Sequence, residues 1–301
     1  MNTRHTAVVL LSLAGWLSAD TVQYAYDAAG RLISATYSSG TVIAYTYDKA
    51  GNLLKRSVTS PQGSGPQISA GGVVNAASFQ AAIARGALAS IFGSNLASGI
   101  AQASQLPLAT TLGGVQVSVA GKAAPLVYVS PTQINFQVPF EAPSSGNVAV
   151  VVTRDSVPSV PQNASMAEYA PGIFTYARTA TVLDPIIVHG GDNALVTPAS
   201  PATANEVLVI YATGVGSFDH PPATGAPAAV SPLAMSLVTP TVTVGSTAAS
   251  VLFAGLTPGF VGLVQVNIQL PSSLPAGSSL PLVLAFGSSK APSVNLSVQA
   301  Q

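Results

Sequence analysis

The sequence predicts an all-β protein in which tandem β-sandwich domains follow a short segment of β-hairpins. A heptapeptide at residues 133–139 (QINFQVP) returns at residues 265–271 as QVNIQLP. Each copy alternates polar with apolar residues and ends at proline, which cannot donate to a β-ladder. Between the copies, short strand patterns alternate with turn residues and almost no helical periodicity is present, which is typical of a β-sandwich.

Composition limits the functions that the chain can perform. Its 301 residues leave room for two or three domains with cores of their own. Charged residues make up 7% and balance at ten against ten, so no basic stripe is present and nucleic acid is not an expected partner. Cysteine is absent, which excludes disulfides, thiolate catalysis and cysteine-bound zinc.

The first residues predict export from the cell. Arg4 precedes a mostly apolar run, Ala7 to Leu17, and Ala19 offers a small residue at a cleavage point. We interpret residues 1–19 as a signal peptide, with an uncleaved N-terminal helix as the alternative. The run is shorter than the roughly 20 apolar residues of a spanning helix, so no transmembrane anchor is expected in the mature chain. The expected location is secreted or at the cell surface.

A repeated tyrosine motif follows at residues 20–58. Residues 24–32 (YAYDAAGRL) are echoed by residues 45–53 (YTYDKAGNL). Alternating tyrosines favour a strand, and Asp followed by Gly favours the tight turn after it, so each unit is predicted to be a β-hairpin. The motif resembles the RHS or YD repeat, whose units stack into long β shells in polymorphic toxins and teneurin-like proteins. Two units are too few for a closed shell, because repeat arrays generally need about three or more.

The tyrosines of this segment are candidates for a binding surface. Five of the nine tyrosines fall between Tyr24 and Tyr47, and such amphipathic rings are common where proteins bind partners or sugars. Packing between strands explains the same spacing and stays open as the alternative. The candidate residues are Tyr24, Tyr26, Tyr45 and Tyr47.

A duplicated body occupies the rest of the chain. Residues 59–70 are rich in Pro, Gly and Ser and are predicted to be a linker. The first domain is expected at 71–175 and the second at 176–301. Three further segments recur in order before each heptapeptide, and each has the pattern of a β-strand: 87–92 with 206–211, 115–121 with 241–245, and 123–128 with 248–253.

Separated motifs across residues 71–301 carry a family resemblance. They are Asn75–Phe79 (NAASF), Tyr128–Pro131 (YVSP), Ala170–Phe174 (APGIF), Ile210–Gly214 (IYATG) and Phe253–Leu263 (FAGLTPGFVGL). The body resembles the Solibacter-type C-terminal domain of exported acidobacterial proteins, which is similar to TIG/IPT folds. The resemblance implies tandem Ig-like β-sandwiches and supplies no catalytic residues. Asn205 stands where that pattern usually has glycine, and asparagine tolerates the same left-handed turn.

The heptapeptides also place rows of amides on single strand faces. Gln133, Asn135 and Gln137 share one face, and Gln265, Asn267 and Gln269 share its counterpart, because strand side chains alternate. Amides both donate and accept, so these rows are candidates for binding a carbohydrate or a partner. The alternative is a buried amide that satisfies the backbone of a loop.

No catalytic or cofactor site is predicted. His189 lies near Asp184 and Asp192 in the sequence, and Asp219 adjoins His220, but these spacings are not those of a metal site. No nucleophile elbow is present, and the glycines at 214 and 216 lack the rest of a dinucleotide-binding loop. We therefore expect no metal, no cofactor and no enzymatic activity, with a hydrolase of unrecognised site as the weakest hypothesis.

The sequence favours an exported, non-enzymatic interaction module whose ligand it does not name. An envelope protein or polysaccharide is the expected type of partner, and the oligomeric state is not fixed. Three alternatives stay open: a carbohydrate-binding protein, a self-assembling surface subunit, and a remnant of a larger RHS-repeat protein. Strands with few charges leave edges able to pair between chains, which keeps self-assembly in view.

Overall fold

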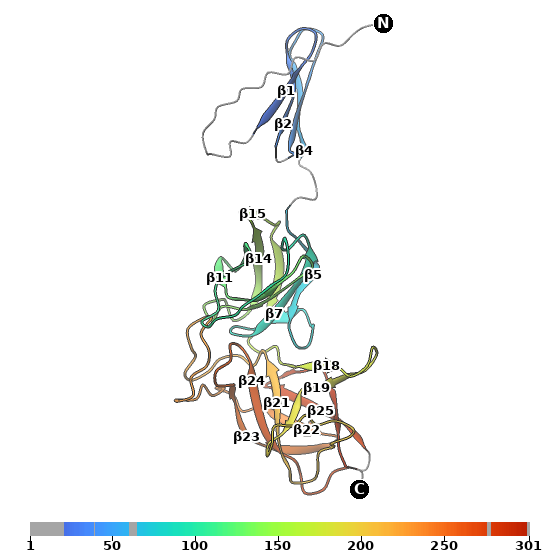
Figure 1. Ribbon diagram of the computed structural model, residues 1–301, viewed down its shortest axis with the longest axis vertical. Coiled ribbons are helices and arrows are strands. Elements are labelled where there is room, and N and C mark those ends of the chain that lie inside the picture. Colours follow the sequence, from blue (N-terminus) through green and yellow to red (C-terminus); the bar gives the residue numbers. More distant parts are fainter. Residues whose placement is uncertain (1–20, 39, 60–64, 276–277, 300–301) are drawn as a thin grey trace. The chain divides into compact units, whose positions relative to one another are not determined.

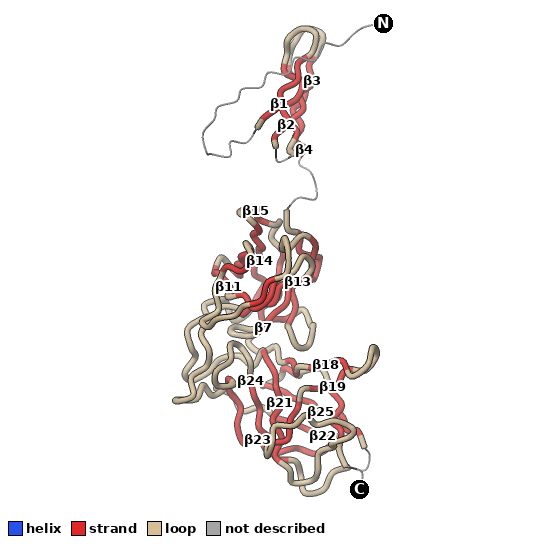
Figure 2. The backbone as a smooth tube through the Cα atoms, in the orientation of Figure 1, coloured by secondary structure: helices blue, strands red, loops and turns tan. Residues whose placement is uncertain are grey.

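The computed structural model describes residues 21–38, 40–59, 65–275 and 278–299. The predicted signal peptide lies outside these residues. The described residues form strands and no helix, which confirms the all-β prediction (Figures 1 and 2). None of them belongs to a helix of the length and apolar character needed to cross a membrane. The chain divides into an N-terminal part, residues 1–64, and a body, residues 65–301.

The N-terminal part contains one four-stranded antiparallel sheet, which we call the YD sheet. Its strands are β1 (Val22–Tyr26), β2 (Leu32–Tyr37), β3 (Val42–Tyr47) and β4 (Leu53–Thr59), paired in sequence order. Asp27 forms the first turn, since its Oδ1 accepts from the backbone N of Ala29 and Arg31 at 3.0 and 2.9 Å. Both predicted hairpins are therefore present.

The first sandwich of the body packs two sheets around one core. One sheet has the order β5-β7-β13-β12-β8 and the other β11-β10-β14-β16-β6, with β9 on β10 and β15 on β14. Phe136, Ile91 and Val117 lie at or near zero exposure in the core between them. The strands are β5 (Gln67–Asn75), β6 (Ala82–Ile83), β7 (Leu88–Ser94), β8 (Ala101–Gln102), β9 (Thr111–Leu112), β10 (Val115–Val119), β11 (Lys122–Ala124), β12 (Leu126–Val129), β13 (Gln133–Gln137), β14 (Gly146–Arg154), β15 (Val157–Pro158) and β16 (Gln162–Met166).

The second sandwich has its own core, which includes Ile210, Ile268 and Phe286. Its main path is β17-β21-β24-β23-β22-β25-β26, with β20 on β21 and β27 on β25, while β18 and β19 form a separate ribbon. The strands are β17 (Gly172–Ile173), β18 (Thr175–Ala177), β19 (Leu183–Pro185), β20 (Ile187–His189), β21 (Val207–Thr213), β22 (Thr241–Val244), β23 (Thr247–Leu256), β24 (Val264–Gln269), β25 (Ser279–Phe286), β26 (Ser289–Lys290) and β27 (Val294–Ser297).

The two sandwiches repeat one strand order. The run β7-β13-β12 of the first corresponds to β21-β24-β23 of the second, and each heptapeptide forms the central strand of its run. In the second copy β23 is continuous and pairs with β22 and then β24. In the first copy the equivalent segment is split into β11 and β12 at Pro125, where the second copy has Ser250. Proline lacks the N–H that the ladder needs.

The strands place the domain boundaries slightly earlier than predicted. β5 begins at Gln67, inside the segment predicted to be a linker, and residues 60–64 of that segment lie outside the described residues. Gly172 and Ile173 of β17 fall within the predicted first domain, 71–175, but they pair with Thr213 and Ala212 of the second sandwich. Local composition marks turns well but does not reveal which distant strand a short segment joins.

Buried hydrogen bonds connect the two sandwiches within the body. Thr213, which is fully buried, accepts from the Leu88 backbone N at 2.9 Å and donates to the Gly262 carbonyl O at 2.9 Å. Asn75 donates its Nδ2 to the Ala170 carbonyl O at 2.8 Å. Buried polar groups without partners are costly, so this pattern ties the relative position of the two sandwiches to specific backbone atoms.

Candidate functional site

One face of the YD sheet gathers most of its tyrosines. Register pairs place Tyr24 opposite Ala35, Ala35 opposite Ile43 and Tyr45 opposite Arg56. Since directly opposed residues and alternate residues of a strand share a face, these pairs define one surface. This tyrosine face consists of Val22, Tyr24, Ala35, Tyr37, Ile43, Tyr45, Arg56 and Val58.

The tyrosine face is mainly apolar and partly accessible, with Tyr37 and Tyr45 half-buried. Ala35 and Ile43 at its centre are buried, whereas Tyr24 is 53% exposed and Val58 is 52% exposed. Gln23, Thr36 and other mainly polar residues occupy the opposite face. A sheet with one apolar face normally buries that face against a second layer, so this surface has the character of a contact surface.

The two remaining candidate tyrosines, Tyr26 and Tyr47, differ in their surroundings. Each follows an irregularity in its hairpin register. The phenol of Tyr47 donates to the Leu32 carbonyl O at 2.9 Å, and the Arg31 guanidinium lies over its ring, 5.0 Å from the centroid. Tyr26 is 58% exposed. Tyr47 therefore stabilises the sheet, and Tyr26 is accessible to a partner.

The amide rows lie on β13 and β24, as predicted, and their contacts are internal. Gln133 Nε2 donates to Asn135 Oδ1 at 2.8 Å, and Gln265 Nε2 faces Asn267 Oδ1 at 3.4 Å. The Ser90 hydroxyl also donates to Asn135. These four amide residues are half-buried rather than displayed on an open surface.

The third amide of each row ends its strand and hydrogen-bonds to the backbone of a loop. Gln137 has no exposed surface; it donates to the Gly86 carbonyl O and accepts from the Gly225 backbone N at 2.7 Å. The prediction that Gln137 lies on a binding surface is therefore wrong, and the alternative of a buried amide that satisfies a loop backbone describes it. Gln269 is exposed and donates to the Asn205 carbonyl O.

A Ser-His-Glu arrangement, which the sequence did not indicate, lies beside β20 and β21. His189 Nδ1 contacts Glu206 Oε1, and Ser200 Oγ lies 3.2 Å from His189 Nε2. Serine hydrolases use this order of groups, but they also need backbone N–H groups free to bind an oxyanion. The Ser200 N–H instead donates to the Thr197 carbonyl O at 3.0 Å, and the Ser200 carbonyl O also lies 3.2 Å from Nε2.

The electrostatics of this cluster favour a charged pair over a general base. Burial opposes protonation of His189, but the hydrogen bond and charge of Glu206 outweigh it and raise the His189 pKa above its usual value. Burial likewise acts against the Glu206 carboxylate, while hydrogen bonds from Thr203 and His189 lower its pKa overall. Glu206 Oε2 accepts from the Thr203 N at 2.7 Å. The cluster therefore stabilises the conformation of the loop between His189 and Glu206.

The acidic residues near the histidines have other partners. Asp184 pairs with Arg178, and Asp192 accepts from the Ala194 backbone N at 2.9 Å. His220 contacts Asp219, with 3.1 Å between Nδ1 and Oδ1, although an extended chain would direct their side chains apart. Within the described residues no three His, Asp or Glu side chains gather in a way that would hold a metal ion.

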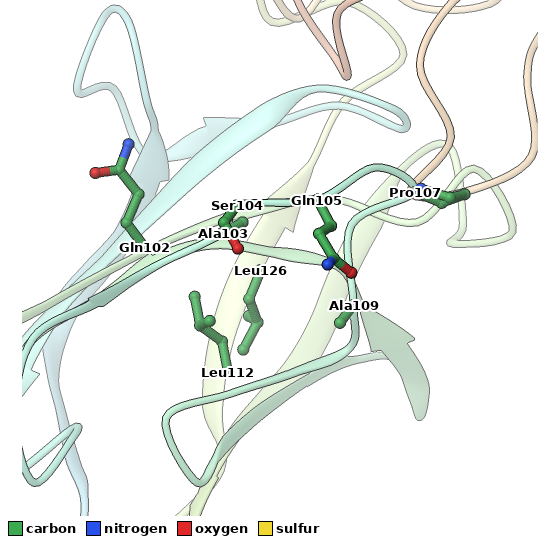
Figure 3. Close-up of a pocket in the computed structure, with 8 residues that line it drawn as sticks. All are labelled: Gln102, Ala103, Ser104, Gln105, Pro107, Ala109, Leu112 and Leu126. Atoms are coloured by element: carbon green, nitrogen blue, oxygen red, sulfur yellow. The ribbon is translucent and has the colours of Figure 1, made fainter.

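The hollows among the described residues of the body include the following two. The first, of about 170 Å³, lies under the loop that follows β8, where the Gln105 side chain points toward Ala109 above Leu112 and Leu126 (Figure 3). The second, of about 260 Å³, is lined by Phe174, Ile186, Tyr211, Phe260 and Leu263. Neither holds a set of converging charged groups, so neither provides the chemistry of a catalytic site.

Comparison with known proteins identifies two modules in the chain. Residues 20–64 match the RHS repeat and residues 73–167 match the IPT/TIG domain. The chain therefore contains the expected repeat and one domain of the expected Ig-like type. No curated protein matches the sequence.

Solved structures with similar folds are distant. A Bacteroides ovatus mixed-linkage glucan utilization locus protein, SGBP-B, in complex with a heptasaccharide is 11% identical with a TM-score of 0.33; the match covers 98% of this chain and 63% of that one. The surface glycan-binding protein PbSGBP-B from Prevotella bryantii is 12% identical with a TM-score of 0.24, covering 76% and 41%. This chain thus spans less than two thirds of the length of either protein.

Proposed function

We propose that this protein is an exported, non-enzymatic interaction module that binds an envelope component through the tyrosine face of its YD sheet. The observation that carries the proposal is the accessibility of an apolar, aromatic sheet face, on which Tyr24 is 53% exposed. Tyrosine combines a large apolar ring with a hydroxyl, and it is enriched where proteins meet partners.

The body supports this role as a scaffold. Its two sandwiches have separate cores, and hydrogen bonds such as the one from the Leu88 backbone N to the Thr213 hydroxyl join them. Two sandwiches joined in this way offer a folded support from which a neighbouring module can be presented. Membership of residues 71–301 in the Solibacter-type group is part of the same proposal and is supported by the motifs quoted above.

The absence of enzymatic activity is also a proposal, supported by the state of the Ser-His-Glu cluster. Its histidine is paired with Glu206 and its serine backbone N–H is already bonded within the Thr197–Ser200 turn. Export is supported by Arg4, the apolar run that follows it and Ala19.

Carbohydrate binding is the second candidate, and the exposed tyrosines favour it. A phenol ring offers an apolar face on which a sugar ring can stack and a hydroxyl that can hydrogen-bond to it. A carbohydrate site and a protein contact would use the same tyrosines. Whether polysaccharide or protein is captured therefore decides between the two functions.

The test is capture of isolated envelope fractions, protein and polysaccharide separately, by the immobilised exported protein. We expect the double variant Tyr24→Ser, Tyr45→Ser to lose at least about tenfold in retained material, because removing aromatic anchors commonly costs more than 1 kcal/mol each. The control is Gln23→Ser, Thr46→Ser on the opposite face of the same strands. Equal retention by the tyrosine variant and the wild type would overturn the proposed site.

A further inference from the structure

The two YD units are copies at the level of strand register. Val22 pairs with Tyr37 in the first hairpin, and Ile43 pairs with Val58 in the second, each residue 21 positions later. The pair Tyr26 and Leu32 recurs in the same way as Tyr47 and Leu53, directly after the register irregularity. The second unit therefore repeats the strand register of the first, so the register and the tyrosine contact at the join can be transferred to the ends of the array, where Asn52 stands at the position of Arg31.

The join between the units is specific. β2 pairs with β3, with Ala35 opposite Ile43 and Ser34 opposite Ala44. The Tyr47 phenol of the second unit donates to the Leu32 carbonyl O of the first, and Arg31 Nη1 donates to the Asp48 carbonyl O at 3.2 Å. Each unit thus offers an outer strand and a turn to the unit that follows it.

Each end of the array carries one of the two strands that such a join needs. β1 and β4 are the outer strands of the sheet, so each has one row of backbone groups facing outward. Tyr26 occupies the position of Tyr47 and is 58% exposed. Leu53 occupies the position of Leu32 and is 53% exposed, and Leu54 beside it is 66% exposed. The β4 end therefore carries the leucine, and the β1 end the tyrosine, that form the hydrogen bond at the join.

We propose that a second copy of this chain completes the join, with β4 of one copy pairing antiparallel with β1 of the next. Transferring the register of β2 and β3 places Arg56 opposite Val22 of the partner subunit and Lys55 opposite Gln23 of the partner subunit. The phenol of Tyr26 of the partner subunit then donates to the Leu53 carbonyl O, as Tyr47 does to Leu32. The tyrosine face continues across the join.

The chemistry of the two edges suits this partner. β4 carries Lys55 and Arg56, while β1 has no charged residue, so like charges do not meet across the join. A repeat array gains stability from each added neighbour and generally needs about three or more units, and two copies supply four. The contact uses different surfaces on the two copies, so it extends as a chain or closes as a ring.

This inference deepens the proposed function, because it rests on the YD sheet as the binding module and names one partner. The absence of cysteine allows a direct test by disulfide trapping in the full chain. Copies with Val22→Cys are mixed with copies with Arg56→Cys under mild oxidation, and directly opposed residues are within reach of a disulfide. The matched control mixes Gln23→Cys with Arg56→Cys, because Gln23 points to the other face.

We expect on the order of tenfold more disulfide-linked dimer from the Val22 and Arg56 mixture than from the control. One chain that carries both substitutions should give a ladder of oligomers, since its own β1 and β4 are separated by two strands. Tyr26→Phe should weaken association by about three- to tenfold, through loss of one hydrogen bond.

Equal trapping in both mixtures, or sedimentation as a monomer at every concentration, would overturn the inference. That result leaves the proposed function standing if the Tyr24 and Tyr45 variant still loses envelope capture. Trapping in the predicted register together with unchanged capture by that variant supports self-association and contradicts the proposed envelope-binding site.

Discussion

Gln137 and Gly86 are joined by a hydrogen bond of 3.3 Å from the side-chain Nε2 to the carbonyl O, and the second sandwich repeats it between Gln269 and Asn205 at the same distance. Gly86 and Asn205 both have positive φ, 70° and 61°, and both shortly precede the strand that pairs with the heptapeptide. The duplicated amide therefore holds a duplicated left-handed turn. Its role is structural in both copies.

Gln137→Leu should destabilise the body by about 1–3 kcal/mol, because it leaves the buried Gly225 N–H without its acceptor. The free energy of unfolding from chemical denaturation is the measurement. Gln269→Leu is the matched control, and it should cost under about 1 kcal/mol since Gln269 is exposed. Equal costs for the two variants would contradict the role assigned to the junction.

Gly214→Ala should be much more destabilising than Gly259→Ala, although both glycines have φ of +81°. A Cβ at Gly214 would lie 1.9 Å from the Ala170 backbone O, whereas none of the surrounding atoms lies within 4 Å of a Cβ at Gly259. The shared left-handed strain costs about 1–2 kcal/mol, and the clash adds roughly 1–3 kcal/mol at Gly214. Similar melting temperatures for both variants would refute this account of the junction.

The pair His189 and Glu206 should make stability depend on pH. The pKa of His189 is raised above 6.5 in the folded state, so its contribution is complete below that value and is lost as pH rises through the folded pKa. The pKa of Glu206 is lowered below 4.5, so its contribution is present above 4.5 and is lost as pH falls.

The difference in unfolding free energy between the wild type and His189→Gln should therefore be largest between pH 4.5 and 6.5. Denaturant titrations from pH 4 to 9 measure it, with His220→Gln as the control for an exposed histidine. A difference that stays constant with pH would show that His189 contributes by packing alone.

Ser200 should not react as a catalytic serine. Its N–H donates to Thr197 and is therefore not available to an oxyanion, so we expect no labelling by a serine-directed fluorophosphonate. Mass spectrometry of the treated protein checks this, with a known serine hydrolase as the positive control. Stoichiometric labelling at Ser200 that His189→Gln abolishes would establish a nucleophile and revive the hydrolase hypothesis.

Most of the fold could be predicted from local pattern. Alternation, proline and glycine located both heptapeptide strands and both YD hairpins, since each depends on residues near one another in the chain. The left-handed turn at Asn205 followed from the family resemblance. The boundaries were less accurate, because β5 and β17 are defined by pairing with β7 and β21 rather than by their own composition.

The candidate site was predicted only in part. The register places Tyr24 and Tyr45 on one face of the sheet, whereas Tyr47 and Gln137 hydrogen-bond to groups within the protein. No spacing rule signals that Glu206 rather than Asp184 or Asp192 meets His189, because a loop of intervening residues brings them together.

The sequence by itself determined the strand periodicity, the duplication of the sandwiches and the repeat of the YD unit, because these follow from the order of neighbouring side chains. Only the tertiary structure decided which polar side chains are exposed to a partner and which hydrogen-bond within the protein. Gln137 meets Gly225 across 88 residues and Thr213 meets Leu88 across 125, and such contacts depend on how the two sandwiches pack. Long-range packing thus removed one predicted amide from the surface of the body.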